Sequence, residues 1–310
     1  MTVLAALPRP MAFVLGGGAG SAAAQVGMLR AVTEAGVFPD LVVGTSAGAL
    51  NGAVLAEDPD GAAQRLSAIW TGLRTRVLIP DSRVQRLRNL GGRRHLYRDV
   101  GLRRLFEQTL ASTTFDALPT PLACVATDLD SGEPAVLREG PLVSALLASC
   151  AVPGVFPMVL RDGRRLADGL CVANLPVRQA LELGAASIVA FDGRPAVQPP
   201  HRRGDVRDTV SAAFAATVTH QTRCDLAHAR AAVPTLILPG QPQQRQKAFD
   251  FSRSAQTIEN AHHATCLFLP GDVDVHALTP ASIPSGSAPA HPRDRAVGGR
   301  ERVPHGQRQQ

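Results

Sequence analysis

A serine between two glycines is the first feature of this chain that suits chemistry. The pentapeptide Gly44-Thr45-Ser46-Ala47-Gly48 follows the apolar run Leu41-Val42-Val43 and precedes the small-residue run Ala49 to Ala56. This order predicts a strand, a sharp turn with Ser46 at its apex, and a helix. Because glycine has no Cβ atom, the two glycines allow a strained turn that exposes the serine hydroxyl as a nucleophile. A serine that only caps the following helix would also fit the pentapeptide.

A second candidate is the glycine loop formed by Gly16, Gly17 and Gly18, within the segment Leu15 to Ser21. Backbone amides in such a loop, at the start of a helix, point at an anion. One possible anion is a dinucleotide pyrophosphate, because the glycine spacing is close to the Rossmann fingerprint. The other is the oxyanion formed when a neighbouring serine attacks an ester. The dinucleotide fingerprint expects an acid at the end of the second strand, whereas Asp40 precedes that strand and belongs at the opposite edge of the sheet.

A serine nucleophile requires a proton acceptor, and histidine and aspartate are both available. Nine histidines occur outside any recognisable motif: His95, His201, His220, His228, His262, His263, His276, His291 and His305. Asp168 is the more suggestive candidate, because the apolar pair Leu166-Ala167 leads into Asp168-Gly169. An Asp-Gly pair by itself is typical of an ordinary turn.

The elements that would position these residues alternate between strands and helices, which predicts a mostly parallel sheet covered on both faces. We expect strands at 11–15, 41–43, 122–126, 187–191 and 235–238. Helices are expected at 21–35, 47–56, 62–73, 141–150 and 176–183, with further helices in the Arg-rich stretch through Leu110. Ser21 would cap the first helix and Gly36 would end it.

Several ordered motifs make the chain, over about Met11 to Pro270, similar to the patatin-like phospholipase family. They are Gly16-Gly17-Gly18, Gly44-Thr45-Ser46-Ala47-Gly48-Ala49-Leu50, Ala126-Thr127-Asp128-Leu129, Leu146-Leu147-Ala148-Ser149, Val152-Pro153-Gly154-Val155-Phe156-Pro157, Asp168-Gly169 and Asn174-Leu175-Pro176-Val177. The resemblance implies a three-layer α/β/α fold with a mostly parallel central sheet. It also implies a Ser-Asp dyad without histidine, in which Ser46 is the nucleophile and Asp168 the general base, and an oxyanion hole made by Gly16 to Gly18.

Two of these motifs depart from the family pattern. Family members often place a basic residue and then glycine late in the glycine loop, whereas Ala19, Gly20 and Ser21 stand here. Oxyanion stabilisation would then rest on backbone amides alone, or on an arginine from elsewhere in the chain. Leu170 replaces the small residue that usually follows Asp-Gly.

The function implied by the resemblance is a serine acyl hydrolase that cleaves carboxylic ester bonds of lipids, like a phospholipase A or a lysophospholipase. One alternative is a serine esterase of the α/β-hydrolase type with a histidine-containing triad. That fold places several strands before the sharp turn that carries the serine, whereas only one strand is expected before this turn here. We call this turn, Gly44 to Gly48, the elbow. The other alternative is a noncatalytic, nucleotide-binding Rossmann-like module.

The five cysteines, Cys124, Cys150, Cys171, Cys224 and Cys266, are odd in number and scattered. No two of them form a CxxC pair, and we find no histidine at ligand spacing from any of them. This pattern predicts reduced thiols in a reducing compartment, with no disulfide framework, no metal and no cofactor.

The formal net charge of +6 rests almost wholly on arginine. Ten arginines gather in one region: Arg74, Arg76, Arg83, Arg86, Arg88, Arg93, Arg94, Arg98, Arg103 and Arg104. This region is a candidate for peripheral contact with an anionic membrane surface, and solvated helices with ion-paired arginines are the alternative. Aromatic residues make up only 4% and form no stacking surface beside the charge, so nucleic acid is not an expected partner.

We expect a catalytic domain at residues 8–270 and a disordered tail, rich in Pro, Gly and Arg, at 271–310. Met1 to Pro10 has no basic start and no clear cleavage site, which argues against a secretory signal. The expected location is therefore the cytoplasm, with contact to membranes from that side. No pattern in the sequence specifies an oligomeric state.

Overall fold

A single sheet organises the part of the chain that the computed structural model describes, which is residues 3–80, 95–194, 206–239 and 248–270. Its strands are β1 (Met11–Leu15), β2 (Leu41–Thr45), β3 (Leu122–Asp128), β4 (Pro134–Leu137), β5 (Val159–Arg161), β6 (Arg164–Asp168), β7 (Ser187–Phe191) and β8 (Thr235–Ile237). The strand order is β5-β6-β3-β2-β1-β7-β8, with β4 paired to β3 off this path. Strands β3, β2, β1, β7 and β8 run parallel, whereas β4 and β6 lie antiparallel to β3, and β5 antiparallel to β6.

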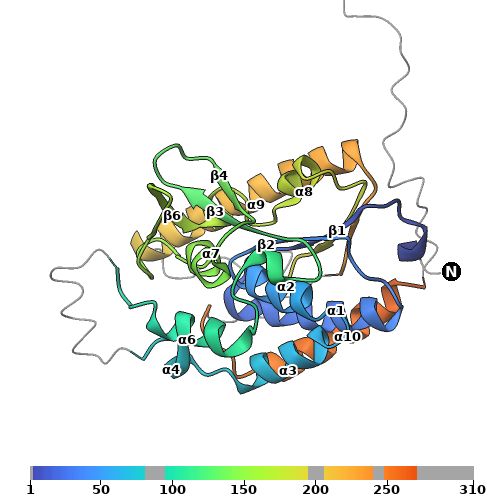
Figure 1. Cartoon of the computed structure of the whole chain (residues 1–310), viewed down its shortest axis with the longest axis horizontal. Coiled ribbons are helices and arrows are strands. Elements are labelled where there is room, and N and C mark those ends of the chain that lie inside the picture. Colours follow the sequence, from blue (N-terminus) through green and yellow to red (C-terminus); the bar gives the residue numbers. More distant parts are fainter. Residues whose placement is uncertain (1–2, 81–94, 195–205, 240–247, 271–310) are drawn as a thin grey trace, which may run out of the picture.

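Helices cover both faces of this sheet (Figure 1). They are α1 (Ala23–Glu34), α2 (Ala47–Glu57), α3 (Ala62–Gly72), α4 (Thr75–Leu78), α6 (Val100–Thr109), α7 (Leu142–Ser149), α8 (Val177–Glu182), α9 (Val206–Ala232) and α10 (Ser254–Phe268). In Figure 1, α1, α2, α3 and α10 lie on one side of the sheet and α8 and α9 on the other. The fold is therefore the three-layer α/β/α arrangement with a mostly parallel sheet that was expected.

The central strands are apolar on both faces because both faces are covered. Phe13 and Leu15 of β1 belong to the larger apolar core, which includes α1 and α2, whereas Ala12 and Val14 belong to the smaller core, which includes Val177 and Ala180 of α8. This alternation follows the two-residue period of a strand. Among the described residues, no helix is both long and apolar enough to cross a bilayer.

The expected strands β1, β2, β3, β7 and β8 are confirmed, and so are the five helices that were given residue ranges. The expected cap of the first helix is wrong: α1 begins at Ala23, after a 3-10 turn at Ala19–Ala22. The Ser21 hydroxyl donates to Gly18 O at 2.8 Å and caps no helical amide. Residues 271–310, expected to be a disordered tail, lie outside the described residues, and the boundaries at 8 and 270 stay predictions.

Strand register brings the predicted site residues to one edge of the sheet. Leu15, the last residue of β1, pairs with Gly44 of β2, so the glycine loop and the elbow leave the sheet side by side. Thr45, just before Ser46, pairs with Val125 of β3, and the next residue of β3, Ala126, pairs with Asp168. Because β6 is antiparallel to β3, Asp168 ends its strand close to Ser46.

Candidate active site

Ser46 sits in a strained turn between β2 and α2. Its φ and ψ are +55° and −126°, a combination that non-glycine residues rarely adopt. The flanking glycines are required by close packing: a Cβ atom on Gly44 would lie 2.7 Å from the Cα atom of Ala49, and one on Gly48 would lie 2.6 Å from Gly16 O. The turn therefore holds the serine in a conformation that an unconstrained chain would leave.

The Ser46 hydroxyl donates a hydrogen bond of 2.7 Å to Asp168 Oδ2. Asp168 has no exposed surface, and Ser46 is 9% exposed, so the pair lies under the surface with only the serine reachable. The structure thus brings together two residues that are 122 positions apart in the sequence.

Asp168 is fixed through its carboxylate and through its backbone. Its Oδ1 accepts from Leu170 N at 2.9 Å, so leucine at this position preserves the turn that follows the aspartate. The Asp168 amide donates to Ala151 O at 2.9 Å, and the Thr127 hydroxyl donates to Asp168 O at 2.7 Å. These contacts hold the carboxylate toward Ser46.

Burial raises the pKa of Asp168 to about 7, because desolvation disfavours the charged carboxylate. Hydrogen bonds from the Ser46 hydroxyl and the Leu170 amide favour the charged form and oppose this rise in pKa. A carboxylate with an ordinary pKa is a weak base, whereas one that titrates near neutrality can accept a proton in a working pH range.

Ser149 and Thr45 support the elbow from below, a role that the sequence did not reveal. The Ser149 hydroxyl accepts from Ser46 N at 2.8 Å and donates to Val125 O at 2.7 Å. The Thr45 hydroxyl donates to Ala173 O at 2.7 Å. Ser149 belongs to a motif named for the resemblance, and that motif was its only signal in the sequence.

The glycine loop passes beside Ser46, because a Cβ atom on Gly17 would lie 3.3 Å from the Cβ atom of Ser46. Two of its three amides already donate hydrogen bonds within the protein. Gly16 N donates to Phe191 O at 3.1 Å and Gly17 N to Asn174 O at 2.9 Å. Within the described part of the chain, the Gly18 amide donates no hydrogen bond, and neither does the amide of Ala47, which follows the nucleophile candidate. These two amides are therefore open to a ligand.

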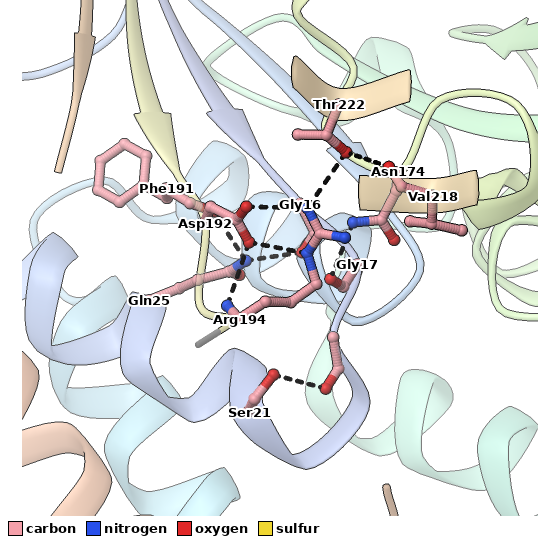
Figure 2. Close-up of polar contacts among 11 residues, drawn as sticks. Gly16, Gly17, Ser21, Gln25, Asn174, Phe191, Asp192, Arg194, Val218 and Thr222 are labelled. Atoms are coloured by element: carbon pink, nitrogen blue, oxygen red, sulfur yellow. Dashed lines mark hydrogen bonds and ion pairs between the residues drawn. The ribbon is translucent and has the colours of Figure 1, made fainter. Parts of the chain in front are cut away.

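A buried glutamine fixes the start of this loop. The side chain of Gln25, fully buried on α1, donates to Gly16 O at 2.7 Å and to Phe191 O at 3.1 Å (Figure 2). Its carbonyl oxygen accepts from Asn51 Nδ2 at 2.8 Å, and Asn51 Oδ1 accepts from the indole of Trp70 at 2.8 Å. The loop is thus connected to α1, α2 and α3 through a chain of polar side chains.

Arg194 is the arginine that approaches the glycine loop. A Cβ atom on Gly18 would lie 3.7 Å from its Cγ atom. Its guanidinium donates to both carboxylate oxygens of Asp192, at 3.0 and 2.9 Å, and to the Thr222 hydroxyl at 3.1 Å (Figure 2). Arg194 therefore packs against the loop through its aliphatic part while its charge is neutralised by Asp192.

An apolar cavity of about 470 Å³ reaches Ala167, the chain neighbour of Asp168, although neither Ser46 nor Asp168 lines it. It is lined by His95, Leu129, Ala151, Pro153, Gly154, Phe156, Pro157, Met158 and Ala167. Ala167 precedes Asp168 in the chain, and Ala151 O accepts its amide hydrogen. Leu129 and Met158 are each 42% exposed, so the cavity opens to solvent through apolar side chains.

Among the described residues, those on which the alternatives depend form no bond with the dyad. Of the five histidines in the described residues, His95, His220, His228, His262 and His263, none forms a hydrogen bond with Ser46 or Asp168. The Asp40 carboxylate accepts from Met11 N at 2.6 Å and pairs with Arg9, at the amino ends of the strands. It thus lies at the edge opposite the glycine loop, as expected, and cannot bind a ribose in front of that loop.

The statement that no histidine lies at ligand spacing from a cysteine is wrong. His220 and Cys224 lie four residues apart on α9, and so do His262 and Cys266 on α10, with Sγ to Nε2 distances of 3.7 and 3.5 Å. Residues four apart share one face of a helix, and the expectation failed because these segments were not interpreted as helices. All five cysteines are unpaired thiols.

The Arg-rich region is described only in part. Arg83, Arg86, Arg88, Arg93 and Arg94 lie outside the described residues. Arg76 on α4 and Arg104 on α6 are exposed, whereas Arg103 pairs with Asp99 at 3.5 Å. Membrane contact through this region stays a prediction.

Comparison with known proteins gives a family match. Residues 13–181 match a family model described as "Patatin-like phospholipase". Similar proteins include a patatin-like phospholipase domain-containing protein of Caenorhabditis elegans, 34% identical over 185 residues, and patatin-like phospholipase domain-containing protein 6 of Homo sapiens, 31% identical over 185 residues. These alignments cover 58% and 59% of this chain and 13% of each relative, so the chain spans a small part of their length. Lysophospholipase nte1 of Aspergillus terreus is 29% identical over 193 residues, 59% of this chain and 12% of that protein.

Among solved structures, VipD from Legionella pneumophila aligns with a TM-score of 0.41 and 14% identity, over 84% of this chain and 67% of that one. The type III effector ExoU aligns with a TM-score of 0.34 and 16% identity, over 88% of this chain and 53% of that one.

Proposed function

The chain belongs to the patatin-like phospholipase family, and on that premise we propose that it is a serine acyl hydrolase that cleaves carboxylic ester bonds of lipids. The observation that carries the proposal is the 2.7 Å hydrogen bond from the Ser46 hydroxyl to the buried Asp168 carboxylate. Phospholipids and lysophospholipids are the substrate class that we propose, in line with the names of the relatives.

In the acylation step, Ser46 Oγ attacks the ester carbonyl carbon while Asp168 Oδ2 takes the hydroxyl proton. The carbonyl oxygen becomes an oxyanion, and we assign its hydrogen-bond donors to the amides of Gly18 and Ala47. Of the three loop amides expected to form the oxyanion hole, only that of Gly18 is kept as a donor. The amides of Gly16 and Gly17 already donate to Phe191 O and Asn174 O. Preorganised donors of this kind each contribute on the order of 10²–10³ in turnover.

The tetrahedral intermediate then collapses, the bond to the alcohol breaks, and Asp168 returns its proton to the leaving oxygen. Water enters and gives a proton to Asp168 as its oxygen attacks the acyl carbon. The second tetrahedral intermediate collapses, the bond to Ser46 Oγ breaks, and Asp168 returns its proton to Ser46 Oγ as the fatty acid leaves. The carboxylate performs every proton transfer, so the proposed cycle uses no histidine, metal or cofactor.

The cavity beside Asp168 is the proposed acyl site. Its apolar lining, with Phe156 and Met158 among the larger side chains, would bury hydrocarbon and leave the ester at the dyad. The exposed side chains of Leu129 and Met158 at its mouth would contact a lipid surface while one chain enters. We further propose that the protein works in the cytoplasm and that the Arg-rich region contacts anionic membranes.

The test uses Ser46→Ala and Asp168→Asn in the full chain, assayed on a short nitrophenyl ester and on a lysophospholipid. Both variants should lose hydrolysis while keeping the circular dichroism spectrum of the wild type. Ser21→Ala is the matched control, because Ser21 also lies at the glycine loop but its hydroxyl donates only to Gly18 O. A fluorophosphonate probe should label Ser46 in the wild type, and labelling of another serine, or full activity of Asp168→Asn, would overturn the dyad.

A further inference from the structure

A cluster of three side chains with metal-binding atoms lies where α1 packs against α10, outside the site described above. It consists of Glu34 at the end of α1 and of His262 and Cys266 on α10. The His262 Nε2 atom lies 2.7 Å from Glu34 Oε2 and 3.5 Å from Cys266 Sγ, and the three atoms are all within 4.8 Å of one another. One imidazole nitrogen thus faces a carboxylate and a thiol at once.

The two helices hold these side chains in fixed relation. At Gly27 of α1 the backbones approach so closely that a Cβ atom would overlap Ile258 O and lie 2.6 Å from His262 N. One turn further along α1, Arg30 donates to both carboxylate oxygens of Glu259 at 2.8 Å. His262 and Cys266, four residues apart, share a face of α10 and meet the end of α1. The cluster is therefore built on two firmly packed helices.

We propose that Glu34, His262 and Cys266 bind a zinc ion. Imidazole nitrogen, thiolate sulfur and carboxylate oxygen are the ligand types that zinc takes in proteins, at about 2.0–2.3 Å from the metal. Tetrahedral geometry at those bond lengths separates N from S by about 3.5 Å and N from O by about 3.4 Å. The first separation already exists, and the second requires the Glu34 carboxylate to move by about 0.7 Å.

The fourth position would be taken by water, because Glu34 and Cys266 are exposed to solvent. Zinc would bind Nε2 of the neutral His262 imidazole, whose hydrogen would then lie on Nδ1, and would displace the thiol proton of Cys266 to the solvent. Binding would link the C-terminal end of α1 to α10. That end lies about 16 Å along the helix axis from the first residue of α1, so the metal would act on stability rather than on ester hydrolysis.

The chain offers a matched control on α9, where His220 and Cys224 have the same spacing and a similar distance of 3.7 Å. Among the described residues, no third side chain places a ligand atom within 4.8 Å of both members of that pair, as Glu34 does for His262 and Cys266. Two ligands on one helix are not expected to hold zinc against a competing chelator. Replacing cysteine with serine should therefore weaken zinc binding at position 266 and leave it unchanged at position 224.

The experiment treats the full 310-residue chain with a chelator to remove bound metal and then titrates zinc against a chromogenic competitor. Wild type and Cys224→Ser should each bind one equivalent, whereas Cys266→Ser and His262→Ala should bind about 100-fold more weakly or worse. With Co²⁺ as the probe, wild type and Cys224→Ser should show thiolate-to-metal charge-transfer absorption that Cys266→Ser lacks. Equal binding by Cys266→Ser and wild type, loss of the equivalent in Cys224→Ser, or no binding by the wild type would each overturn the site.

Discussion

At the scale of single residues, Asp168 combines a proposed chemical role with a stability penalty. A buried carboxyl whose pKa is raised from 3.8 to about 7 prefers to be protonated in the folded state. Holding it ionised at higher pH costs about 4 kcal/mol, at roughly 1.4 kcal/mol per pKa unit. The ionised form of the proposed general base thus lowers the stability of the fold, and the same raised pKa would let it accept a proton near neutrality.

This penalty predicts a pH-dependent gain in stability for Asp168→Asn. Between pH 4 and 7 Asp168 holds more of its proton in the folded state than in the unfolded chain, so its contribution to the free energy of unfolding falls as pH rises and levels off above pH 7. Asparagine cannot ionise, and its side chain can still accept from Leu170 N. The variant should therefore lack this fall and exceed the wild type by a few kcal/mol at pH 8, as measured by urea unfolding at pH 5 and pH 8.

Asp128→Asn is the control, because the expected change in stability at pH 8 has the opposite sign. A hydrogen bond from Arg164 is the main cause that lowers the pKa of Asp128, so its carboxylate stabilises the fold at neutral pH and loses that effect as pH falls through its folded pKa. This variant should be less stable than the wild type at pH 8. If the free energy of unfolding changed with pH in Asp168→Asn as it does in the wild type, the raised pKa of Asp168 would be contradicted.

The same pKa predicts the pH dependence of catalysis. Only the ionised Asp168 accepts a proton, so kcat/KM should rise tenfold per pH unit below about 7 and then reach a plateau. The measurement is initial ester hydrolysis in a pH-stat from pH 5 to 9. Repeating it at two temperatures identifies the base, because the pKa of a carboxyl group changes little on warming whereas that of imidazole falls. A midpoint that shifts downward on warming would favour a histidine.

The sequence motifs predicted Ser46 and Asp168 as the candidate dyad. Their burial and hydrogen bonds, in contrast, are visible only in the fold. The sequence does not show that Asp168 has no exposed surface, and its pKa depends on that burial. The same limit applies to His262 and Cys266. Their spacing is visible in the sequence, but it becomes ligand spacing only once α10 is known to be a helix and Glu34 to face it.

At the scale of elements, the glycine loop depends on the polar chain that starts at Gln25. Replacing Gln25 with methionine keeps the volume but leaves Gly16 O without its donor and removes a partner of Asn51. We expect about 1–3 kcal/mol of destabilisation and a fall in kcat of up to about 100-fold as the loop shifts, with little change in KM. Urea unfolding and ester kinetics measure both effects.

Ser21→Ala is the comparison for that experiment, since Gly18 O keeps its bond from Ser21 N when the hydroxyl is lost. Its effect on kcat should be small. If Gln25→Met kept the wild-type kcat, the glycine loop would not need its anchor for catalysis.

The parallel strands were predictable because burial on both faces leaves continuous apolar runs such as Met11–Leu15 and Ser187–Phe191. The antiparallel strands β4, β5 and β6 were missed because they are short and partly exposed, and so carry a weak pattern. Helix α9 was missed for another reason: much of its surface faces solvent, so its residues lack a clear apolar period.

At the scale of the whole molecule, exposed arginines lie on both helical layers. Helices α4 and α6, with exposed Arg76 and Arg104, lie on the opposite side of the sheet from α9, which exposes Arg223 and Arg230 (Figure 1). If membrane binding used net charge alone, removing two arginines from either layer would have the same effect. If it used the Arg-rich region, only the first pair would matter.

We therefore predict that the double variant Arg76→Ala, Arg104→Ala binds anionic vesicles about 30-fold more weakly than the wild type, since each arginine near a membrane surface contributes about 1 kcal/mol. The double variant Arg223→Ala, Arg230→Ala, with the same loss of charge, should bind like the wild type. Co-sedimentation with phosphatidylglycerol vesicles at low and high salt measures this, and binding by the wild type should weaken with salt because mobile ions screen the attraction. Equal losses in the two double variants would show that contact depends on total charge, and binding that persists at high salt would assign it to apolar side chains such as Leu129 and Met158 at the mouth of the cavity.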